Sequence, residues 1–159
     1  MLSRQAQNAL VGWEAHGPRI IQCYAPTNDY NEDVKDQFHD RLQSIVEKCP
    51  TKDLTILMGD FNAKVETVNT RYEDIMGRHG LGERNENGER FAFSKLVIGG
   101  IHKTTWTSPD HTTQNQIDHI CINKKFRRMM ENVRTKTAAD IASDHHLLDA
   151  KMKLKLKKY

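Results

Sequence analysis

A run of apolar residues that ends in a polar cluster limits most strongly what this chain can fold into. Residues 54–58 (LTILM) are almost continuously apolar, a pattern typical of a strand that is covered on both faces. Residues 19–25 (RIIQCYA) form an earlier run that ends at Pro26 and also predicts a buried strand. The chain is therefore expected to contain a sheet covered by other elements.

The segment between these two runs predicts a long amphipathic helix. Its apolar residues follow the spacing i, i+4, i+8, i+11, i+12 and i+15, which forms one stripe on a helix of 3.6 residues per turn: Val34, Phe38, Leu42, Ile45, Val46 and Cys49. Asp29 and Glu32 have the spacing of a capping box before this stripe, and Pro50 follows it. Strand, helix and strand in this order predict a βαβ-like arrangement packed in layers.

The rest of the chain predicts further strands separated by polar segments. Residues 104–107, 117–122 and 148–156 each predict a strand. The last of these alternates strictly between apolar and charged residues, so it should have one dry face and one face covered by lysine. Residues 66–90 are polar and contain four glycines, which indicates loop or surface, and a short helix is expected over 89–95.

The distribution of charge is more informative than its sum. The 159 residues carry 24 Lys and Arg against 21 Asp and Glu, and the resulting net charge of +3 predicts no partner by itself. The basic residues gather late in the chain, however. Residues 124–136 contain six Lys or Arg against Glu131, and residues 151–159 contain five lysines and no acid. The second half of the chain is therefore the candidate face for a polyanion, with a solvated basic face as the alternative.

Cysteine content and hydropathy exclude several classes of protein. The three cysteines form no CxxC pair, which argues against a zinc site or a disulfide framework and favours reduced core cysteines. No apolar stretch has the length of a membrane-spanning helix or the position of a signal peptide. We therefore expect an intracellular protein, the nucleus included, that is not secreted and has no membrane partner.

Polar clusters lie at the ends of the apolar runs, where α/β folds place their sites. In residues 59–63 (GDFNA), Asp60 and Asn62 are two positions apart and point the same way on extended chain. They can hold a phosphate-bound water or a hard cation, or they can form an ordinary turn. Asp118 lies inside a core strand and needs a partner there, either a structural one or an imidazole that it orients. His119 alternates to the other face and is expected to be structural.

A last cluster precedes the C-terminal strand. In residues 143–146 (SDHH), adjacent Asp and His can serve as metal ligand and as acid or base. We expect His145 to act in catalysis and His146 to pack or bond nearby. The triplet Asp-His-His also occurs in an unrelated class of metal phosphoesterases, so it does not identify a function by itself.

The order and spacing of the three clusters resemble the endonuclease/exonuclease/phosphatase superfamily, which includes deoxyribonuclease I and the abasic-site endonucleases. GDFNA matches the central motif, QIDHI (residues 116–120) matches the strand-borne Asp motif, and SDH matches the closing motif. Residues 24–28 (YAPTN), 78–85 (RHGLGERN) and 102–106 (HKTTW) further resemble the endonuclease of RTE-type non-LTR retrotransposons. The resemblance covers nearly all of the chain. It implies an α/β (α+β) fold that is part of a four-layer α/β/β/α two-sheet sandwich of the deoxyribonuclease I-like type.

The resemblance also implies an activity, divalent-metal-dependent hydrolysis of phosphodiesters by a DNA endonuclease that nicks. Asp60 would activate the water or protonate the leaving group, and Asn62 would position the phosphate. His145, paired with Asp118, would stabilise the pentacovalent phosphate or move a proton. Tyr24 would reach the scissile phosphate.

Metal and DNA contacts follow from the same resemblance. Asp144 and Asp60 would hold Mg²⁺ or Mn²⁺, which take oxygen ligands, and no small-molecule cofactor is expected. DNA is the expected partner, and its backbone would be contacted by the basic residues that begin the segment after the Asp motif: Lys124, Lys125, Arg127 and Arg128.

Two motifs of the superfamily are not found in this sequence. Its domain begins with a strand that carries an Asn and a strand that ends in a metal-binding Glu, whereas residues 1–22 contain only Glu14, in a segment (WEAHG) that does not match. We therefore expect residues 1–159 to form the C-terminal portion of one such domain, with residues 151–159 as the basic end of its last strand. Metal should be held weakly if at all, and activity should be impaired. The alternative is a non-catalytic nucleic-acid-binding remnant.

Overall fold

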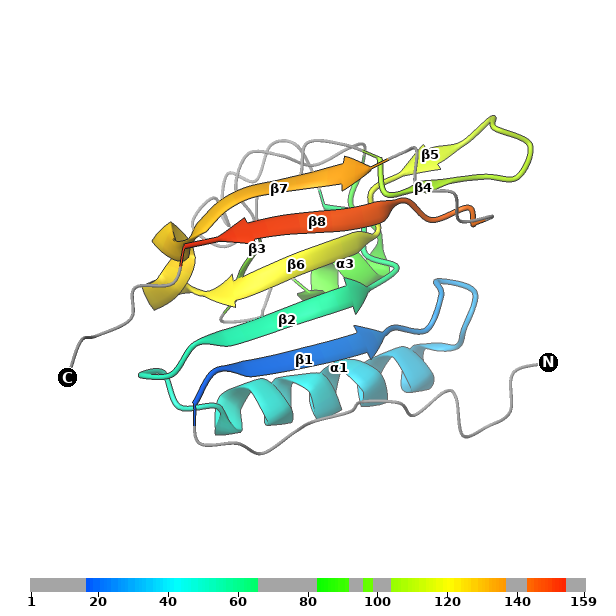
Figure 1. Ribbon diagram of the computed structural model, residues 1–159. Helices are drawn as coiled ribbons and strands as arrows, with labels where there is room; N and C mark the ends of the chain where they lie inside the picture. The colour runs from blue at the N-terminus through cyan, green and yellow to red at the C-terminus, as the bar shows by residue number, and fades with distance from the viewer. Residues whose placement is uncertain (1–16, 66–82, 92–95, 99–103, 137–142, 154–159) are drawn as a thin grey trace.

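A four-stranded mixed sheet forms the centre of the fold. The computed structural model describes residues 17–65, 83–91, 96–98, 104–136 and 143–153 (Figure 1). Within these ranges the main sheet has the order β1-β2-β6-β3, in which β1 is Arg19–Tyr24, β2 is Thr55–Asp60, β6 is Asp118–Asn123 and β3 is Leu96–Ile98. β1 and β2 are parallel, whereas β6 runs antiparallel to β2 and to β3. The parallel pair is connected by the helix α1 (Glu32–Lys48), so the predicted strand-helix-strand unit is confirmed.

Two smaller sheets and two short helices complete the described elements. β4 (Trp106–Thr107) pairs with β5 (Gln114–Asn115), and β7 (Met130–Lys136) pairs with β8 (Leu147–Met152). The 3₁₀ helix η2 (Lys124–Met129) connects β6 to β7. The short helix α3 (Glu86–Phe91) begins earlier than expected, so the loop predicted for residues 66–90 is wrong from residue 86 onward. Residues 66–82, 92–95 and 154–159 lie outside the described part. No helix in the described ranges is long and apolar enough to cross a membrane.

Helix α1 forms over the predicted apolar stripe but begins at a different cap. The side chain of Asn31 accepts a hydrogen bond from the backbone N–H of Val34 at 3.0 Å, which satisfies one of the free donors of the first turn. Acidic residues in that turn suit the positive end of the helix dipole. The predicted capping box of Asp29 and Glu32 is wrong, because Asn31 is the residue directly before the helix.

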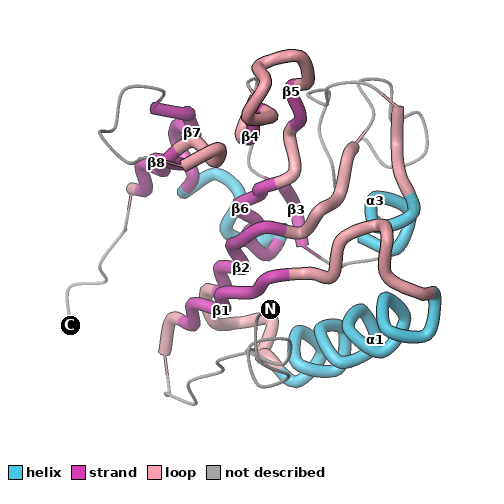
Figure 2. The backbone as a smooth tube through the Cα atoms, turned by 90° about the vertical axis from the view of Figure 1, so that its right-hand side faces the viewer, coloured by secondary structure: helices cyan, strands magenta, loops and turns pink. Residues whose placement is uncertain are grey.

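The two faces of the main sheet are covered by different layers. Leu57 of β2 is fully buried in the cluster that also contains Leu42 of α1 and Phe91 of α3. Its neighbours on β2, Ile56 and Met58, belong to the second cluster, which includes residues of β7 and β8. Figure 2 shows helices on one side of the sheet and the β7–β8 pair on the other. The prediction of a strand covered on both faces is thus confirmed for β2.

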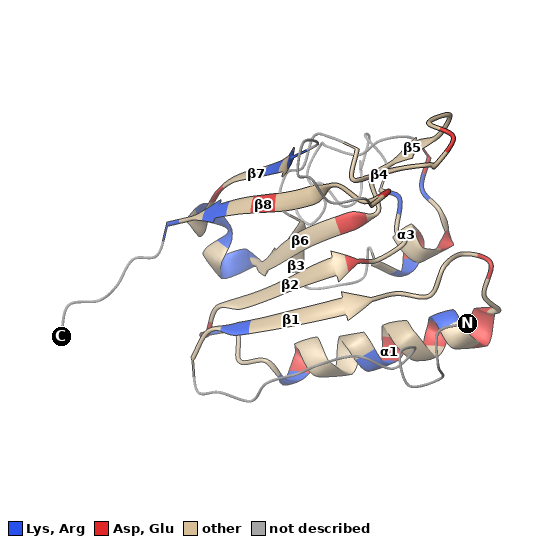
Figure 3. Cartoon of the chain, turned by 45° about the vertical axis from the view of Figure 1, so that its right-hand side comes forward, with Lys and Arg blue, Asp and Glu red and all other residues tan. Residues whose placement is uncertain are grey.

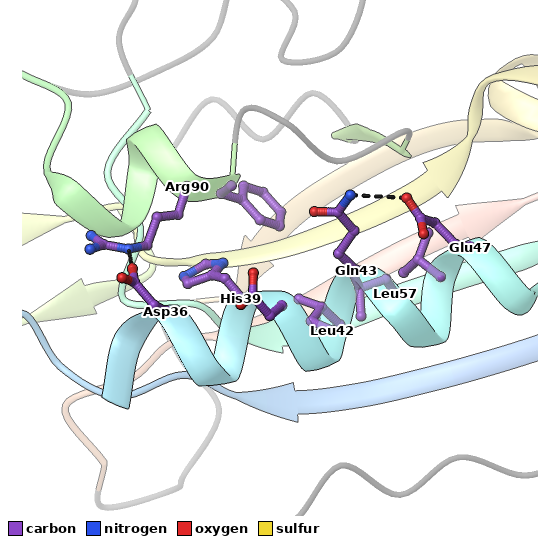
Figure 4. Close-up of a pocket in the computed structure, with 10 residues that line it drawn as sticks. Asp36, His39, Leu42, Gln43, Glu47, Leu57 and Arg90 are labelled. Carbon is purple, nitrogen blue, oxygen red and sulfur yellow. Dashed lines mark hydrogen bonds and ion pairs between the residues drawn. The ribbon is translucent and has the colours of Figure 1, made fainter. Parts of the chain in front are cut away.

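Ion pairs join α3 to α1. The guanidinium of Arg90 donates a hydrogen bond from Nε to Asp36 Oδ1 at 2.8 Å and also pairs with Glu32. Beneath these contacts His39 lines a pocket between the two helices (Figure 4). Burial lowers the pKa of His39 to about 4, so its ring is neutral at physiological pH. The contacts hold α3 against the helical layer and, with it, the residues that precede α3.

A close approach of β1 and β2 requires a glycine just before the first polar cluster. Gly59 has a φ of +144°, and a Cβ at this position would lie 1.9 Å from the carbonyl oxygen of Cys23 on β1. Only glycine combines this backbone conformation with this spacing. Gly59 therefore allows β2 to stay paired with β1 up to Asp60.

Candidate active site

The strand register brings three of the predicted site residues together at one end of the main sheet. Asp60 is the last residue of β2 and Asp118 is the first residue of β6, and the antiparallel register places them opposite one another. On its other side Asp60 is paired with Tyr24, the last residue of β1. Tyr24, Asp60 and Asp118 therefore lie side by side on neighbouring strands (Figure 1).

β4 carries the segment that contains His145 to the same end. His145 forms an isolated antiparallel bridge with Trp106, and the flanking bonds run from Thr107 N to Asp144 O (2.9 Å) and from His146 N to Thr105 O (2.7 Å). The hydroxyl of Thr105 in turn accepts a hydrogen bond from the backbone N–H of Asp118 at 3.0 Å. Thr105 thus joins the His145 segment to β6.

His145 lies between two carboxylates. Its Nδ1 is 3.1 Å from Asp118 Oδ2, and its Nε2 is 4.0 Å from Asp60 Oδ2. When Nδ1–H donates to Asp118, the ring orientation is fixed and Nε2 faces the side of Asp60. Of the two alternatives for Asp118, the geometry favours the acid that orients an imidazole.

Asp60 is poised to change its protonation near neutral pH. The pKa of Asp60 is raised to about 6, mainly by burial and to a smaller extent by the nearby carboxylates of Asp118 and Asp144. The backbone N–H of Asn62, which donates to Asp60 Oδ1 at 2.8 Å, and the ring of His145 act in the opposite direction. A carboxyl group with such a pKa suits general acid or base catalysis.

Asn62 is held in a left-handed turn directly after Asp60. Its φ is +47°, a conformation that asparagine tolerates better than most residues. The turn brings the backbone N–H of Asn62 to Asp60, and the amide Nδ2 donates to Ala25 O at 2.9 Å. The same Nδ2 lies 3.4 Å from Asp60 Oδ2, so the two side chains are neighbours, although a turn brings them together and not the extended chain that was expected.

Asp144 and Tyr24 border this cluster. The indole N–H of Trp106 donates to Asp144 Oδ2 at 2.8 Å and holds the pKa of this exposed carboxyl below its usual value. Tyr24 is 56 % exposed. Its pKa is raised by partial burial and then by the charges of Asp60 and Asp144, so its hydroxyl stays protonated and within electrostatic range of both carboxylates.

Several side chains of this cluster offer the ligand atoms that a divalent cation requires. Asp60, Asp118 and His145 each offer a ligand atom within 4.8 Å of the others. Asp118 and His145, however, already satisfy one another through a hydrogen bond. The carboxylates of Asp60 and Asp144 supply the hard oxygens that Mg²⁺ and Mn²⁺ take. The predicted ligand Asp144 is not part of this group, so Asp60 is the one predicted metal ligand among the three, and water or phosphate would complete the shell of a cation held there.

The basic residues predicted to contact DNA lie away from this cluster. They sit in η2, which follows the last residue of β6, whereas Asp118 is the first residue of β6. A six-residue strand spans roughly 20 Å, so η2 and the cluster occupy opposite ends of the sheet (Figure 3). The four side chains are exposed: Lys124, Lys125, Arg127 and Arg128.

The predictions that His119 is structural and that His146 packs or bonds nearby are confirmed by their contacts. His119 is fully buried, and its Nε2 lies 2.7 Å from Ala63 O. His146 Nε2 lies 3.1 Å from the hydroxyl of Thr107. The roles of Thr105, which anchors Asp118, and Trp106, which holds Asp144, were not predicted. The sequence predicts a strand over residues 104–107 and resembles retrotransposon endonucleases there, but neither observation indicates these contacts.

Comparison with known sequences indicates a family for this chain. Residues 18–148 match the family model described as endonuclease-reverse transcriptase. Proteins named craniofacial development protein 2, from Tragulus javanicus and Bos taurus, are each 34% identical to this chain over 182 residues. The match covers 99% of this chain and 31% and 30% of the two relatives, so the chain spans about a third of their length.

Solved structures agree at the level of the fold. The 3′ phosphatase NExo from Neisseria, bound to a product DNA hairpin, has a TM-score of 0.67 and 19% identity, with 91% of this chain and 65% of that one covered. The endonuclease domain of TRAS1, a telomere-specific non-LTR retrotransposon, has a TM-score of 0.64 and 17% identity, with 92% and 64% covered. An AP endonuclease from Archaeoglobus fulgidus has a TM-score of 0.64 and 15% identity, with 91% and 65% covered. The predicted deoxyribonuclease I-like α/β fold is therefore confirmed, and this chain belongs to the endonuclease-reverse transcriptase family.

Proposed function

We propose that this chain hydrolyses phosphodiester bonds in DNA with the help of a divalent metal, as a nicking endonuclease of the retrotransposon type. The observation that carries the proposal is the array of Asp118, His145 and Asp60, in which an imidazole lies between two carboxylates. One of these carboxylates has a pKa near 6. Such an array can hold and move a proton at neutral pH, as hydrolysis of a phosphodiester requires.

The side chains divide the work of the reaction. Asp60, when ionised, accepts a proton from the attacking water, and when protonated it can give one to the leaving oxygen. His145 keeps Nδ1–H on Asp118, and in its doubly protonated form it places Nε2–H toward the phosphate oxygens, where negative charge accumulates in the transition state. The amide of Asn62 and the hydroxyl of Tyr24 border the same space and orient the phosphate.

We further propose that Asp60 and Asp144 would hold Mg²⁺ or Mn²⁺, which when bound neutralises charge on the phosphate and on the leaving oxygen. Two carboxylates leave most of the coordination shell to water, and Mg²⁺ gives up water reluctantly. We therefore propose that the chain binds the metal weakly and that its activity is impaired. Asp118 is not needed as a ligand, because its carboxylate already accepts from His145.

We propose that the basic residues of η2 contact DNA at some distance from the cleaved bond. They lie roughly 20 Å from Asp118, which corresponds to about six base pairs of duplex. The structure of NExo with a product DNA hairpin supports DNA as the partner of this fold. A DNA substrate also favours a nuclear location.

A non-catalytic nucleic-acid-binding role is the second candidate. It is favoured by the exposure of the η2 cations and by their separation from the carboxylates, because binding there needs neither metal nor Asp60. A nicking assay therefore tests the catalytic role, and the salt dependence of DNA affinity tests the binding role separately.

Removal of the central imidazole should abolish nicking. Supercoiled plasmid incubated with the purified chain and Mg²⁺ should be converted to open circles, and His145→Ala should reduce the rate by about 100-fold or more, as expected for loss of a general acid-base group. His111→Asn is the matched control, because His111 is an exposed turn residue at φ +58°, a conformation that asparagine accepts. Equal rates for the wild type and His145→Ala would contradict a catalytic role.

The η2 cations should set the salt dependence of DNA binding. Replacing Lys124, Lys125, Arg127 and Arg128 by glutamine should flatten the slope of log K against log salt by about 2 to 4, since each phosphate contact contributes about 0.9. Lys48→Gln with Lys52→Gln changes two exposed lysines near the end of α1 and is the control. An unchanged slope would mean that the η2 cations form only a solvated face.

Asp60 should destabilise the folded chain once it ionises. Its folded pKa of about 6 lies above the ordinary value of 3.8, so its cost is absent below pH 3.8, grows between pH 4 and 6 and is complete above that. In EDTA, the stability of Asp60→Asn relative to the wild type should therefore rise by about 2.5 kcal/mol from pH 4 to pH 7.5. Asp144→Asn, at a carboxyl whose pKa is lowered, should show the opposite trend in urea denaturation. A flat difference for Asp60→Asn would contradict the raised pKa.

A further inference from the structure

We propose that Asn85, Asn87 and Gly88 form a clamp that positions the turn of Asp60 and Asn62 relative to the loop after β1. The inference rests on the proposed function, because it gives a positioning role in that chemistry to a motif that the catalytic array does not use. The motif lies before and within the first turn of α3.

Within the described residues, the side chain of Asn85 makes three hydrogen bonds to backbone groups. Its Nδ2 donates to Asn62 O at 2.8 Å, and its Oδ1 accepts from Lys64 N at 2.9 Å and from Gly88 N at 2.8 Å. The side chain of Asn85 thus bonds to the backbone on both sides of Ala63 and connects this backbone to α3. These bonds use the amide's donor and acceptor at once, which neither aspartate nor alanine can reproduce.

Asn87 extends the contact to the loop that follows Tyr24. Its side chain is fully buried, and Nδ2 donates to Pro26 O at 2.8 Å while lying 3.5 Å from Asn62 O. A buried amide in this place connects two backbone segments that no sheet hydrogen bond joins beyond Asp60. Asn87 therefore helps to hold the loop after Tyr24 near Asn62, together with Asn62 itself, whose Nδ2 donates to Ala25 O.

Gly88 permits this close packing. A Cβ at Gly88 would lie 2.0 Å from the carbonyl oxygen of Lys64, so no larger residue fits without moving the backbone. The first turn of α3 thus rests directly on the chain that follows Asn62. Asn85, Asn87 and Gly88 each lie against the backbone of residues 62–64, which explains their spacing.

A further amide completes the grip on Asn62. Asn28 Nδ2 donates to Asn62 O at 3.3 Å, and Asn28 O accepts from Lys35 Nζ of α1, also at 3.3 Å. Lys35 is only 2 % exposed and also pairs with Glu86 of α3. Three side-chain amides therefore surround the carbonyl of Asn62, a residue in the left-handed conformation whose N–H caps Asp60.

Asn85→Asp tests the clamp, because it keeps the acceptor and removes the donor. Asn123→Asp is the matched control: Asn123 also bridges backbone, through Thr55 N (3.1 Å) and Asp53 O (2.9 Å), but at the other end of the sheet. Amide hydrogen exchange of Asn62, measured by NMR, should accelerate about 10-fold or more in Asn85→Asp and stay unchanged in the control. In nicking assays kcat should fall by about 10- to 100-fold in Asn85→Asp with KM for DNA unchanged, since misplacement of a catalytic group acts on the chemical step.

The two readouts separate the clamp from the proposed function. If the wild type does not nick, hydrogen exchange still decides the clamp, and the proposed function alone fails. If Asn62 exchanges at the wild-type rate in Asn85→Asp, or if the control lowers kcat equally, the clamp is overturned. Should Asn85→Asp not fold, the exposed Asn28→Ala decides, because the clamp predicts faster exchange at Asn62 and an unchanged rate overturns it.

Discussion

The pairing of β2 with β6 is the constraint on which the site depends. Because the two strands are antiparallel and Asp60 ends one where Asp118 begins the other, two carboxylates meet at one sheet end. Their mutual repulsion and the burial of Asp60 would be costly without compensation. His145 relieves part of this cost by lying between them, and the N–H of Asn62 relieves part of it at Asp60. The same arrangement that is unfavourable for stability leaves Asp60 with a pKa suited to proton transfer.

The supporting elements act mainly by holding backbone rather than by touching the reacting atoms. Gly59 keeps β2 close to β1 up to Asp60, and Thr105 anchors the start of β6. The network of Lys35 and Arg90 with acidic residues holds α3 against α1. Each of these contacts joins segments that are distant in sequence, so the site is a product of the layered packing. The distance between the site and the η2 cations follows from the same packing. The site includes Asp118, the first residue of β6, and η2 follows the last residue of β6.

Patterns within one element predicted their structure well, whereas contacts between elements were not predictable from them. The spacing of Val34, Phe38 and Leu42 predicted α1 because one helix face is buried, and the alternation around Leu148 predicted β8. β7 was not predicted, because most of its residues are polar and only Val133 and Thr135 are buried. The cap was misassigned to Asp29 because Asn31 is an equally good cap and only the chain path decides between them.

The candidate site was predictable as a set of residues but not as a geometry. The partner of Asp118 could not be read from its strand, since His145 lies 27 positions away. The pairing came from the resemblance to a nuclease family. Asn85 and Trp106 lie in motifs that resemble retrotransposon endonucleases, but the resemblance did not indicate what their side chains contact. Asparagine is common in turns, so residues 83–89 did not distinguish a clamp from a loop. The indole N–H of Trp106 acts on Asp144, 38 positions away.

Single-turnover cleavage of a DNA duplex by Asp118→Asn tests the central claim most directly. Asparagine keeps the shape of Asp118 but removes the charge that fixes the proton on Nδ1 of His145. If the array of Asp118, His145 and Asp60 performs the hydrolysis, the rate of the chemical step should fall by about 100-fold or more while the dissociation constant for DNA stays the same. An unchanged rate, or a loss explained fully by weaker DNA binding, would contradict the account.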